Sequence, residues 1–252
     1  LGDRGRRARQ LVLYFVGDSL IRNQYQALCR VLTGTQPSII HGGIDHCKTE
    51  EVYVGYTWRS FLDATAIRRM KDEGWPPPDV VYADAGLHQL HLHPYKEMTY
   101  LMFEGHLHFE EWLRRALKAY RKDAPGAKIE VMTPFPVCEE KFVGSWATVV
   151  AEAKEHPGQA ARPCVDTWVS LDRREAQAQD VCENTLLTRV GSERVATVIR
   201  KVVAELQPSL GSELVDLWNL TDGHCDLCGQ DGRHYAPMVL QQLAEFFGVN
   251  GW

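Results

Sequence analysis

The sequence predicts an α/β protein, a three-layer α/β/α sandwich with a mainly parallel central sheet. Short apolar runs of strand length alternate with longer segments of helical period along most of the 252 residues. The apolar runs lack polar alternation, which indicates strands buried on both faces, as in parallel sheets. Helix-length spacers between such strands imply right-handed parallel crossovers, and these place helices on both faces of the sheet.

The first predicted strand covers residues 11–17, where six consecutive apolar residues precede Gly17. Further strands are expected at residues 51–58, 79–85, 128–134 and 212–218. Helices are expected at residues 19–33, 60–73, 105–122, 146–155, 186–206 and 236–247. Three prolines at 76–78 require an extended entry into the strand that follows them. The triplet Ala124-Pro125-Gly126 ends the helix before it and begins a turn.

The chain is predicted to contain one domain. Residues 1–10 carry four arginines and are interpreted as a solvated basic tail or linker. Residues 11–252 show no internal repeat and no low-complexity break, so we expect a single domain there. Residues 155–185 are rich in charge and proline, and we interpret them as a long, disulfide-tied excursion that borders a substrate cleft.

Composition excludes some classes of partner. A hydrophobic content of 44% and a charged content of 24% are ordinary for a globular protein. The net charge of −5 argues against nucleic acid as a partner, because phosphate binding needs clustered lysine and arginine. No apolar run reaches the roughly 18 residues of a membrane span. A membrane anchor outside this chain stays compatible with the sequence, and the oligomeric state cannot be read from it.

Cysteine usage indicates an oxidising compartment. Seven cysteines predict three disulfides with one thiol left over, in a connectivity that spacing does not reveal. The candidates are Cys29, Cys47, Cys138, Cys164, Cys182, Cys225 and Cys228. Asn219-Leu220-Thr221 is a candidate N-glycosylation site. Together these features favour the secretory pathway, either its lumen or the extracellular space.

The most informative residue for function is Ser19. It follows the strand at residues 11–17 and opens a helical pattern. In open α/β sheets this junction is where reactive groups lie, and the positive end of the helix favours an oxyanion there. Ser19 is therefore a candidate nucleophile. The alternative is that its hydroxyl serves merely as the N-cap of the helix.

A wider pattern surrounds this serine. The segment Gly17-Asp18-Ser19-Leu20-Ile21-Arg22-Asn23-Gln24 resembles the GDSL-x-RNQ segment of the trichome-birefringence-like proteins. These belong to the PC-esterase group of the SGNH/GDSL hydrolase superfamily. Asp231-Gly232-Arg233-His234 resembles the D-x-x-H block of the same family, and the segments at 54–62 and 79–88 resemble blocks between the two. The resemblance spans nearly the whole chain in the right order and implies an SGNH-hydrolase-like, flavodoxin-like fold.

The resemblance implies a catalytic triad. Ser19 would be the nucleophile, His234 the general base and Asp231 the acid that orients the imidazole, because a serine hydroxyl needs such activation. The spacing of three residues lets the Asp231 carboxylate reach the imidazole of His234. The alternative is that Asp231 caps the C-terminal helix and His234 is a surface histidine.

The resemblance also implies a set of supporting residues. In the superfamily a glycine and an asparagine help to stabilise the oxyanion. Gly86 matches that glycine, but Asp84 stands where the family has asparagine, and a carboxylate donates no hydrogen bond unless it is protonated. Gly43 is the candidate for a further glycine block. The remaining expected contributors to the oxyanion site or its support are Gly17, Asp18, Arg22, Asn23, Gln24 and His88.

Two other interpretations of the C-terminal cysteines stay open. His224, Cys225, Cys228 and His234 have spacing compatible with a zinc site. A redox-active C-x-x-C pair is disfavoured, because no thioredoxin-like strand-to-helix pattern precedes it. Structural disulfides near the catalytic loop are the favoured interpretation, with no metal in the site. The cluster His88, His91 and His93 is interpreted as a polar loop with His88 as its functional member.

Family members with known activity move acetyl groups on and off hydroxyls of polysaccharides and glycans, commonly in the Golgi lumen. The resemblance therefore implies an O-acetyltransferase that acts through an acyl-serine intermediate. A carbohydrate acetylesterase is the alternative, and a non-catalytic glycan-binding relative is a third. No cofactor is required. The acetyl donor, acetyl-coenzyme A or an acetyl ester, would be a co-substrate, and the partner would be a carbohydrate.

Overall fold

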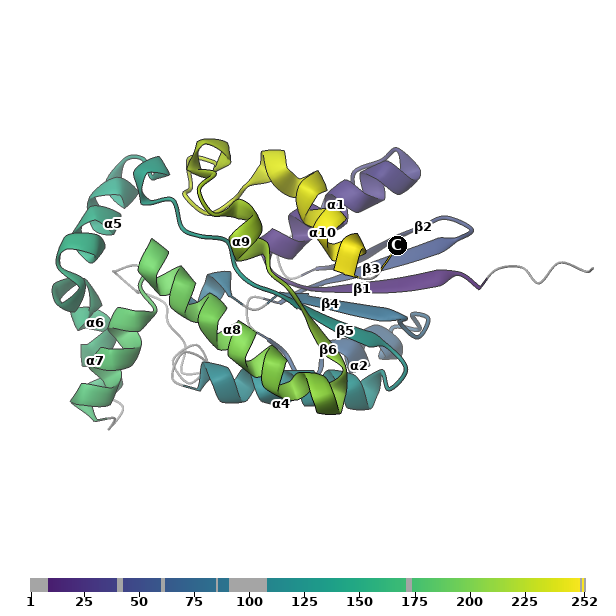
Figure 1. The fold of residues 1–252 in the computed structure, drawn as a ribbon, viewed down its shortest axis with the longest axis horizontal. Helices are drawn as coiled ribbons and strands as arrows, with labels where there is room; N and C mark the ends of the chain where they lie inside the picture. The colour runs from purple at the N-terminus through teal and green to yellow at the C-terminus, as the bar shows by residue number, and fades with distance from the viewer. Residues whose placement is uncertain are drawn as a thin grey trace, which may run out of the picture.

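Six strands form the central sheet, in the order β2-β3-β1-β4-β5-β6 (Figure 1). The computed structural model describes residues 9–39, 43–59, 62–84, 86–90, 108–170, 174–249 and 251. Strands β1, β3, β4, β5 and β6 are parallel, whereas the edge strand β2 runs antiparallel to β3. The strands are β1 (Leu11–Gly17), β2 (Ile44–Lys48), β3 (Val52–Trp58), β4 (Val80–Asp84), β5 (Lys128–Met132) and β6 (Ser212–Val215). The predicted, mainly parallel α/β sheet is confirmed.

Helices cover both faces of the sheet, which completes the predicted three layers (Figure 1). One face carries α1 (Ser19–Thr33), α9 (Leu217–Thr221) and α10 (Val239–Val249), and the other carries α2 (Ala66–Asp72), α4 (Phe109–Asp123) and α8 (Arg189–Leu210). Side chains of β1 alternate between the two cores: Tyr14 and Val16 pack into one, Leu13 and Phe15 into the other. All four are buried, as the unbroken apolar run predicts.

Several predicted elements differ in extent from those observed. The strand expected at 212–218 ends at Val215, because Asp216 caps the short helix α9 and accepts a hydrogen bond from the Asn219 amide N–H. The helix expected at 60–73 begins at Ala66, and that expected at 236–247 divides into η4 (Ala236–Met238) and α10. Strand β2 was not predicted, because its five residues are polar or half-exposed and pair at one edge.

The predicted excursion at residues 155–185 consists of helices. Helix α5 (Ser145–Glu155) leads into α6 (Pro157–Ser170) and α7 (Glu175–Asn184), and these three lie beyond the carboxyl ends of the strands (Figure 1). The disulfide Cys164–Cys182 joins α6 to α7, so the predicted covalent tie is confirmed. Trp168 and Ala161 of α6 are buried and belong to the same apolar core as Ala178 of α7.

Three disulfides are present, as the cysteine count predicts. Besides Cys164–Cys182 they are Cys29–Cys47, which joins α1 to β2, and Cys138–Cys225. Cys228 is the thiol left over, and burial raises its pKa to about 12. Three disulfides are consistent with a secreted or lumenal protein.

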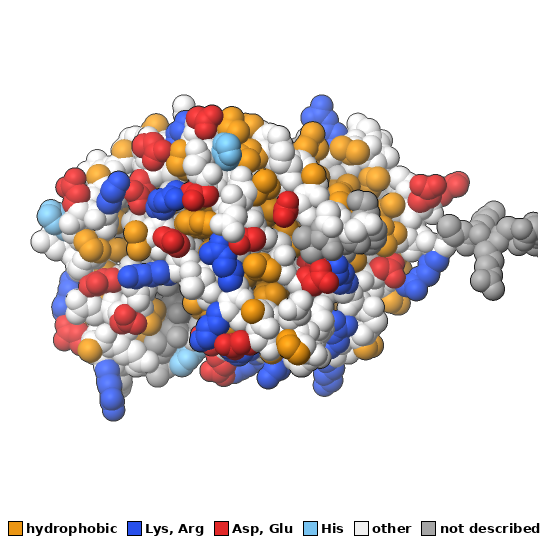
Figure 2. Space-filling model, viewed as in Figure 1, with side chains coloured by type: hydrophobic (Ala, Val, Ile, Leu, Met, Phe, Trp, Pro, Cys, Tyr) orange, Lys and Arg blue, Asp and Glu red, His pale blue; other side chains and the backbone are white. Residues whose placement is uncertain are grey.

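Two further observations concern the surface and the helices. In the described part of the chain, no helix combines the length and the apolar composition needed to cross a bilayer. On the face drawn in Figure 2, acidic and basic side chains are interspersed and form no large patch of one sign.

Candidate active site

The turn between β1 and α1 presents Ser19 at the carboxyl edge of the sheet. Asp18, not Ser19, is the N-cap of α1: its Oδ1 accepts the Leu20 amide N–H at 2.8 Å. The alternative that Ser19 serves merely as an N-cap is therefore wrong. Ser19 is the first residue of the helix, is 8% exposed, and its hydroxyl is left to contact another element.

Gly17 permits a close approach of two strand ends. A Cβ atom at this position would lie 2.6 Å from the Cβ of Asp84 and 2.8 Å from Cγ2 of Ile21. Such distances are sterically forbidden, so a side chain here would push the serine turn away from β4. The glycine is thus required by packing.

The loop at residues 229–234 forms the opposite side of the site. The Gly229 amide donates to the His234 carbonyl at 2.8 Å and closes the loop on itself. Gly232 has a φ of +64°, and a side chain there would collide with the Phe142 ring and the Cys138 carbonyl. The Cys138 amide also donates to the Gly232 carbonyl at 2.9 Å. The loop is therefore held from outside as well as from within.

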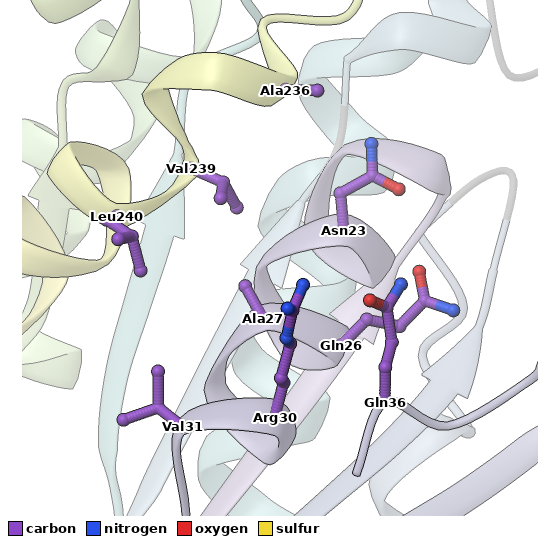
Figure 3. Close-up of a pocket in the computed structure, with 9 residues that line it drawn as sticks. All are labelled: Asn23, Gln26, Ala27, Arg30, Val31, Gln36, Ala236, Val239 and Leu240. Atoms are coloured by element: carbon purple, nitrogen blue, oxygen red, sulfur yellow. The ribbon is translucent and has the colours of Figure 1, made fainter. Parts of the chain in front are cut away.

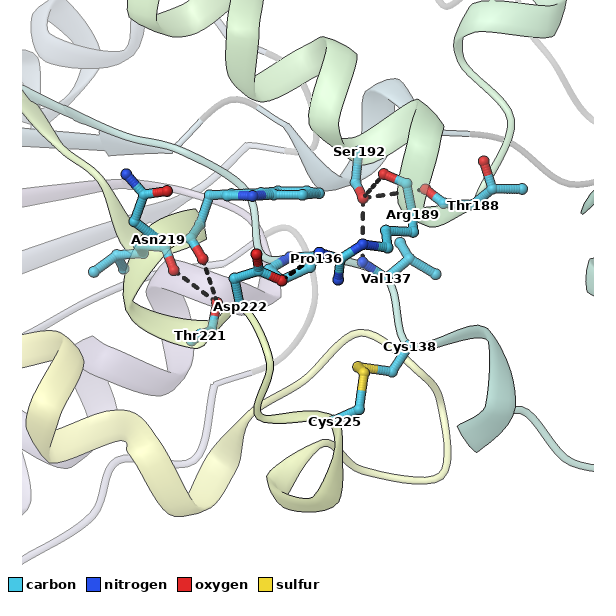
Figure 4. A network of polar contacts seen from close by, with 12 residues as sticks. Pro136, Val137, Cys138, Thr188, Arg189, Ser192, Asn219, Thr221, Asp222 and Cys225 are labelled. Atoms are coloured by element: carbon cyan, nitrogen blue, oxygen red, sulfur yellow. Dashed lines mark hydrogen bonds and ion pairs between the residues drawn. A yellow bond between two sulfur atoms is a disulfide. The ribbon is translucent and has the colours of Figure 1, made fainter.

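A network behind this loop fixes the segment that supports it (Figure 4). Ser192 Oγ, on α8, accepts the Val137 amide N–H at 3.1 Å, and the Cys138–Cys225 disulfide follows directly. The Arg189 guanidinium pairs with Asp222 at 2.5 Å. Helix α8 is thereby joined to both chain segments that flank the disulfide.

Ser19, His234 and Asp231 form a continuous chain of hydrogen-bonding groups. His234 Nε2 lies 2.7 Å from Ser19 Oγ, although 215 residues separate the two. His234 Nδ1 lies 2.5 Å from Asp231 Oδ2. A neutral imidazole with its proton on Nδ1 satisfies both contacts: Nδ1–H donates to the carboxylate and Nε2 accepts the serine O–H.

The environment of Asp231 keeps its carboxylate ionised. Burial alone would raise the pKa of Asp231, but hydrogen bonds from the His234 ring and from the Arg233 and His234 amides outweigh it. The net result is a pKa well below the ordinary value. A charged acceptor at this position fixes the orientation of the imidazole.

This lowered pKa predicts a pH-dependent contribution to stability. Because the folded pKa lies below the unfolded value of 3.8, the contribution is fully present above that value and is lost as pH falls through the folded pKa. We expect Asp231→Asn to lower the midpoint of thermal unfolding at neutral pH. The gap to the wild type should shrink as pH falls from about 5 toward about 2. Thermal scans across this range measure the gap, and a constant gap would contradict the linkage.

The other predicted oxyanion and support residues gather at the same edge. Asp84 ends β4 beside Gly17 and is 3% exposed. His88 Nε2 lies 3.9 Å from the Asp18 carboxylate. Gly86 packs against Pro134, and the Gly43 carbonyl accepts the Trp58 amide N–H at 3.0 Å. His91 and His93 lie outside the described residues.

Tyr56 is a site residue that the sequence analysis did not single out. Its hydroxyl lies 3.3 Å from the Gly17 carbonyl and 3.4 Å from that of Asp18, so it donates to the serine turn from behind. Burial raises the pKa of Tyr56 strongly, and the nearby carboxylates of Asp18 and Asp84 raise it further. The hydroxyl therefore stays protonated. The sequence signal that could have found it is a hydroxyl-bearing aromatic residue near the carboxyl end of the strand predicted at 51–58.

Two arginines near the serine turn lower the pKa of Tyr56 and so oppose the effect of the Asp18 and Asp84 carboxylates. The guanidinium groups of Arg22 and Arg59 oppose the rise in the Tyr56 pKa, which places both charges close to its ring. Arg22 also lies over the Trp58 ring, with Cζ 5.4 Å from the centroid. Its role as a support of the turn stays a prediction.

Asn23 and Gln24 point in different directions from α1. Gln24 is fully buried, and its Oε1 accepts the Tyr82 hydroxyl at 3.0 Å, which joins the helix to β4. Asn23 faces outward and lines a groove between α1 and α10.

The structure bears on the zinc and glycosylation interpretations. Cys225 is disulfide-bonded to Cys138, and His234 contacts Ser19, so two of the four residues of the zinc interpretation have other partners. Asn219 lies on α9 and its side-chain amide donates to Asp216 Oδ2 at 2.8 Å. Its glycosylation stays a prediction.

Comparison with known proteins gives matches among solved structures. No protein-family model matches the chain, and neither does any curated protein. A protein described as a GDSL-like lipase from Parabacteroides merdae is 12% identical, with a TM-score of 0.45, and the match covers 94% of this chain and 97% of that one.

Two further solved structures are similar to the chain. LAE5, an α/β hydrolase from the metagenome of Lake Arreo, is 15% identical with a TM-score of 0.47, over 97% and 96% of the two chains. The periplasmic domain of a lipopolysaccharide acetyltransferase from Salmonella ser. Paratyphi A is 9% identical with a TM-score of 0.42, over 94% and 84%.

Proposed function

We propose that this chain is a serine-dependent acyl-ester enzyme of the SGNH/GDSL type, and specifically an O-acetyltransferase that acts on hydroxyls of a polysaccharide or glycan. One observation carries the enzyme assignment. The contacts Ser19 Oγ to His234 Nε2 and His234 Nδ1 to Asp231 Oδ2, at 2.7 and 2.5 Å, have the order and atom types that activate a serine hydroxyl.

In the first half-reaction, Ser19 Oγ attacks the acyl carbonyl while His234 Nε2 takes its proton. The Asp231 carboxylate holds the imidazole and balances the charge that it gains. The developing oxyanion lies at the positive end of α1, where the Ser19 amide would donate. The Gly86 and Gly43 amides are proposed as further donors. His234 then gives the proton to the leaving alcohol, which leaves an acyl-Ser19 ester.

In the second half-reaction, a sugar hydroxyl or water attacks the acyl-serine ester with His234 again as base. Attack by a sugar gives transfer, and attack by water gives hydrolysis. The His234 side chain keeps 21% of its surface exposed, which favours access by either nucleophile. A carbohydrate acetylesterase is therefore the second candidate function.

The remaining parts of the proposal follow from the motif resemblance. The acyl donor would be acetyl-coenzyme A or a small acetyl ester, with no other cofactor. Asp84 departs from the family asparagine, and its carboxylate would orient Arg22 or a sugar hydroxyl and leave oxyanion stabilisation to backbone amides. The location would be the Golgi lumen or the extracellular space.

A two-part experiment tests this proposal. A fluorophosphonate probe should label the protein, and peptide mass spectrometry should place the label on Ser19. The enzyme is then incubated with 4-nitrophenyl acetate, with and without oligosaccharide acceptors, while free acetate and acetylated sugar are quantified. We expect acetylated sugar to form and free acetate to decrease when an acceptor is present.

Each outcome separates the candidate functions. Free acetate at the same rate with and without acceptors would favour the esterase over the transferase. Absence of both Ser19 labelling and acyl turnover would overturn the enzyme assignment and favour a glycan-binding protein.

A further inference from the structure

A pocket of about 620 Å³ lies beside the turn between β2 and β3, at the end of the sheet opposite to Ser19. Tyr53 lines it and pairs with Val12 near the start of β1, whereas Gly17 ends β1 at the serine turn. The length of β1 between Val12 and Gly17 is about 17 Å. We call this pocket the edge pocket, and it is separate from the proposed catalytic groups.

Three aromatic rings meet in the edge pocket. The His46 ring stacks on the Tyr53 ring, with centroids 5.2 Å apart and an interplanar angle of 11°. The Trp75 ring lies 5.9 Å from His46 and 6.0 Å from Tyr53, measured between centroids. Tyr53 is buried, Trp75 is half-buried and His46 is exposed. A ligand would therefore meet the outer face of His46 and the uncovered part of Trp75.

The Trp75 ring is held in one orientation by its neighbours. A Cβ atom at Gly55 would lie 2.4 Å from Cζ3 and 2.6 Å from Cε3 of Trp75, so this edge of the indole is packed against the strand. The indole N–H lies on the opposite edge of the ring system and points away from β3. Beneath it, the Tyr14 ring packs edge-on at 5.8 Å, and its hydroxyl donates to the Pro76 carbonyl at 2.6 Å.

Polar groups around the rings offer both hydrogen-bond donors and acceptors. Lys48 and Glu73 line the edge pocket with opposite charges, are exposed, and join no ion pair among the residues that the structure describes. Gln10 Nε2 donates to the Thr49 carbonyl at 2.8 Å, which leaves Gln10 Oε1 as an acceptor. Thr49 Oγ1 accepts the Val52 amide N–H at 3.1 Å, which leaves its O–H as a donor. The balanced charge favours an uncharged ligand.

We propose that the edge pocket binds a sugar residue of a neutral glycan chain. A pyranose ring has a face of C–H groups, which packs on an aromatic ring, and a rim of hydroxyls, each of which both donates and accepts hydrogen bonds. The rings of His46 and Trp75 match the face, and the mixed donors and acceptors match the rim. The site holds a chain and takes no part in the acyl chemistry, so the inference goes beyond the proposed function and does not depend on it.

The groove between α1 and α10, with a volume of about 560 Å³, lacks this combination (Figure 3). One wall carries polar side chains such as Gln26 and Arg30, and the other carries aliphatic ones such as Val239 and Leu240. Among the described residues that line it, none is aromatic. The face of a sugar finds no ring to pack on there, so this groove serves as the comparison in the test.

A titration followed by NMR tests the proposal. Isotope-labelled protein with Ser19→Ala, which cannot form an acyl-serine, is titrated with cellohexaose, xylohexaose and mannohexaose. We expect the Trp75 indole N–H and His46 ring signals to shift with at least one of them, while the Leu240 methyl signals stay in place. Because the nucleophile is absent, failure of the proposed acyl chemistry would leave this result unaffected.

Three results of this titration would overturn the proposal. One is the absence of a shift at Trp75 and His46 with all three oligosaccharides. Another is a shift with oligogalacturonate alone, which would identify an anion site. The third is a shift with adenosine alone, which would identify a site for flat heteroaromatic rings.

Two substitutions then locate the site. Trp75→Leu and His46→Ala should each raise the Kd of the oligosaccharide about fivefold or more, as loss of an aromatic contact implies. His156→Ala changes another exposed histidine, at the end of α5, and should leave the Kd unchanged. With Ser19 intact, all three variants should hydrolyse 4-nitrophenyl acetate at the wild-type rate. His46 is exposed, so its variant should fold even if Trp75→Leu does not, and an unchanged Kd in His46→Ala would overturn the assignment.

Discussion

Replacement of Ser19 by alanine is expected to lower kcat for any acyl ester by 10³-fold or more, with little change in stability. The change removes the atom that forms the acyl bond, while His234, Asp231 and the helix end stay in place. Losses on the order of 10³ to 10⁶ are typical when the nucleophile of a triad is removed. Release of 4-nitrophenol under saturating ester, followed over hours, measures the residual rate.

A matched substitution separates chemistry from folding. Ser145 is also the first residue of a helix, α5, and is exposed, so Ser145→Ala should retain the activity of the wild type. Thermal unfolding of both variants should coincide with that of the wild type to within a few degrees, because the N-cap of α1 is Asp18. A Ser19→Ala variant with most of its activity would contradict the role proposed for this hydroxyl.

The elements predicted well are those whose signal is local. Residues 11–17 form a strand as predicted, because six adjacent apolar residues can be buried only in the middle of a sheet. The helix at 19–33 has the bounds predicted for it, since its apolar spacing and its left-handed Gly34 mark both the face and the end. Strand β2 lacked such a signal. Its side chains are exposed or half-buried at the edge of the sheet, so its sequence has no run of buried apolar residues that would indicate a strand.

The Asp231–His234 contact was predictable from residue spacing, whereas the Ser19–His234 contact was expected only from the family resemblance. The D-x-x-H spacing is a local feature, so contact between Asp231 and His234 could be expected from sequence. Contact between His234 and Ser19 depends on the sheet order, in which β6 lies three strands from β1, and spacing along the chain does not contain that order. Tyr56 was overlooked for the same reason: its carbonyl partners belong to a neighbouring strand end.

The disulfide connectivity shows the same limit. Cys29–Cys47 and Cys164–Cys182 each span 18 residues, whereas Cys138–Cys225 spans 87. Both Cys225 and Cys228 precede the catalytic loop, so sequence could not tell which of them pairs. Tertiary packing decides this, because Cys138 follows β5 on the same side of the sheet as the loop.

Loss of the Cys138–Cys225 disulfide is expected to lower both the free energy of unfolding and the activity more than loss of Cys164–Cys182 does. In the loop-entropy treatment, its removal costs about 4.5 kcal/mol of unfolding free energy, against about 3 kcal/mol for Cys164–Cys182. We therefore expect the double variant Cys138→Ser/Cys225→Ser to have the lower denaturation midpoint of the two corresponding serine pairs. Urea unfolding followed by circular dichroism measures the difference.

The effect on activity should separate the two disulfides further. The Cys138 amide donates to the Gly232 carbonyl, in the loop that carries Asp231 and His234, so loss of the bond to Cys225 lets this loop shift. A displacement of about 1 Å in a catalytic group lowers the rate on the order of 10²-fold. At a temperature where both variants are folded, Cys138→Ser/Cys225→Ser should lose at least about tenfold in kcat/KM. Cys164→Ser/Cys182→Ser, far along the chain from this loop, should not. Equal activity in the two variants would show that the backbone contacts alone hold the loop.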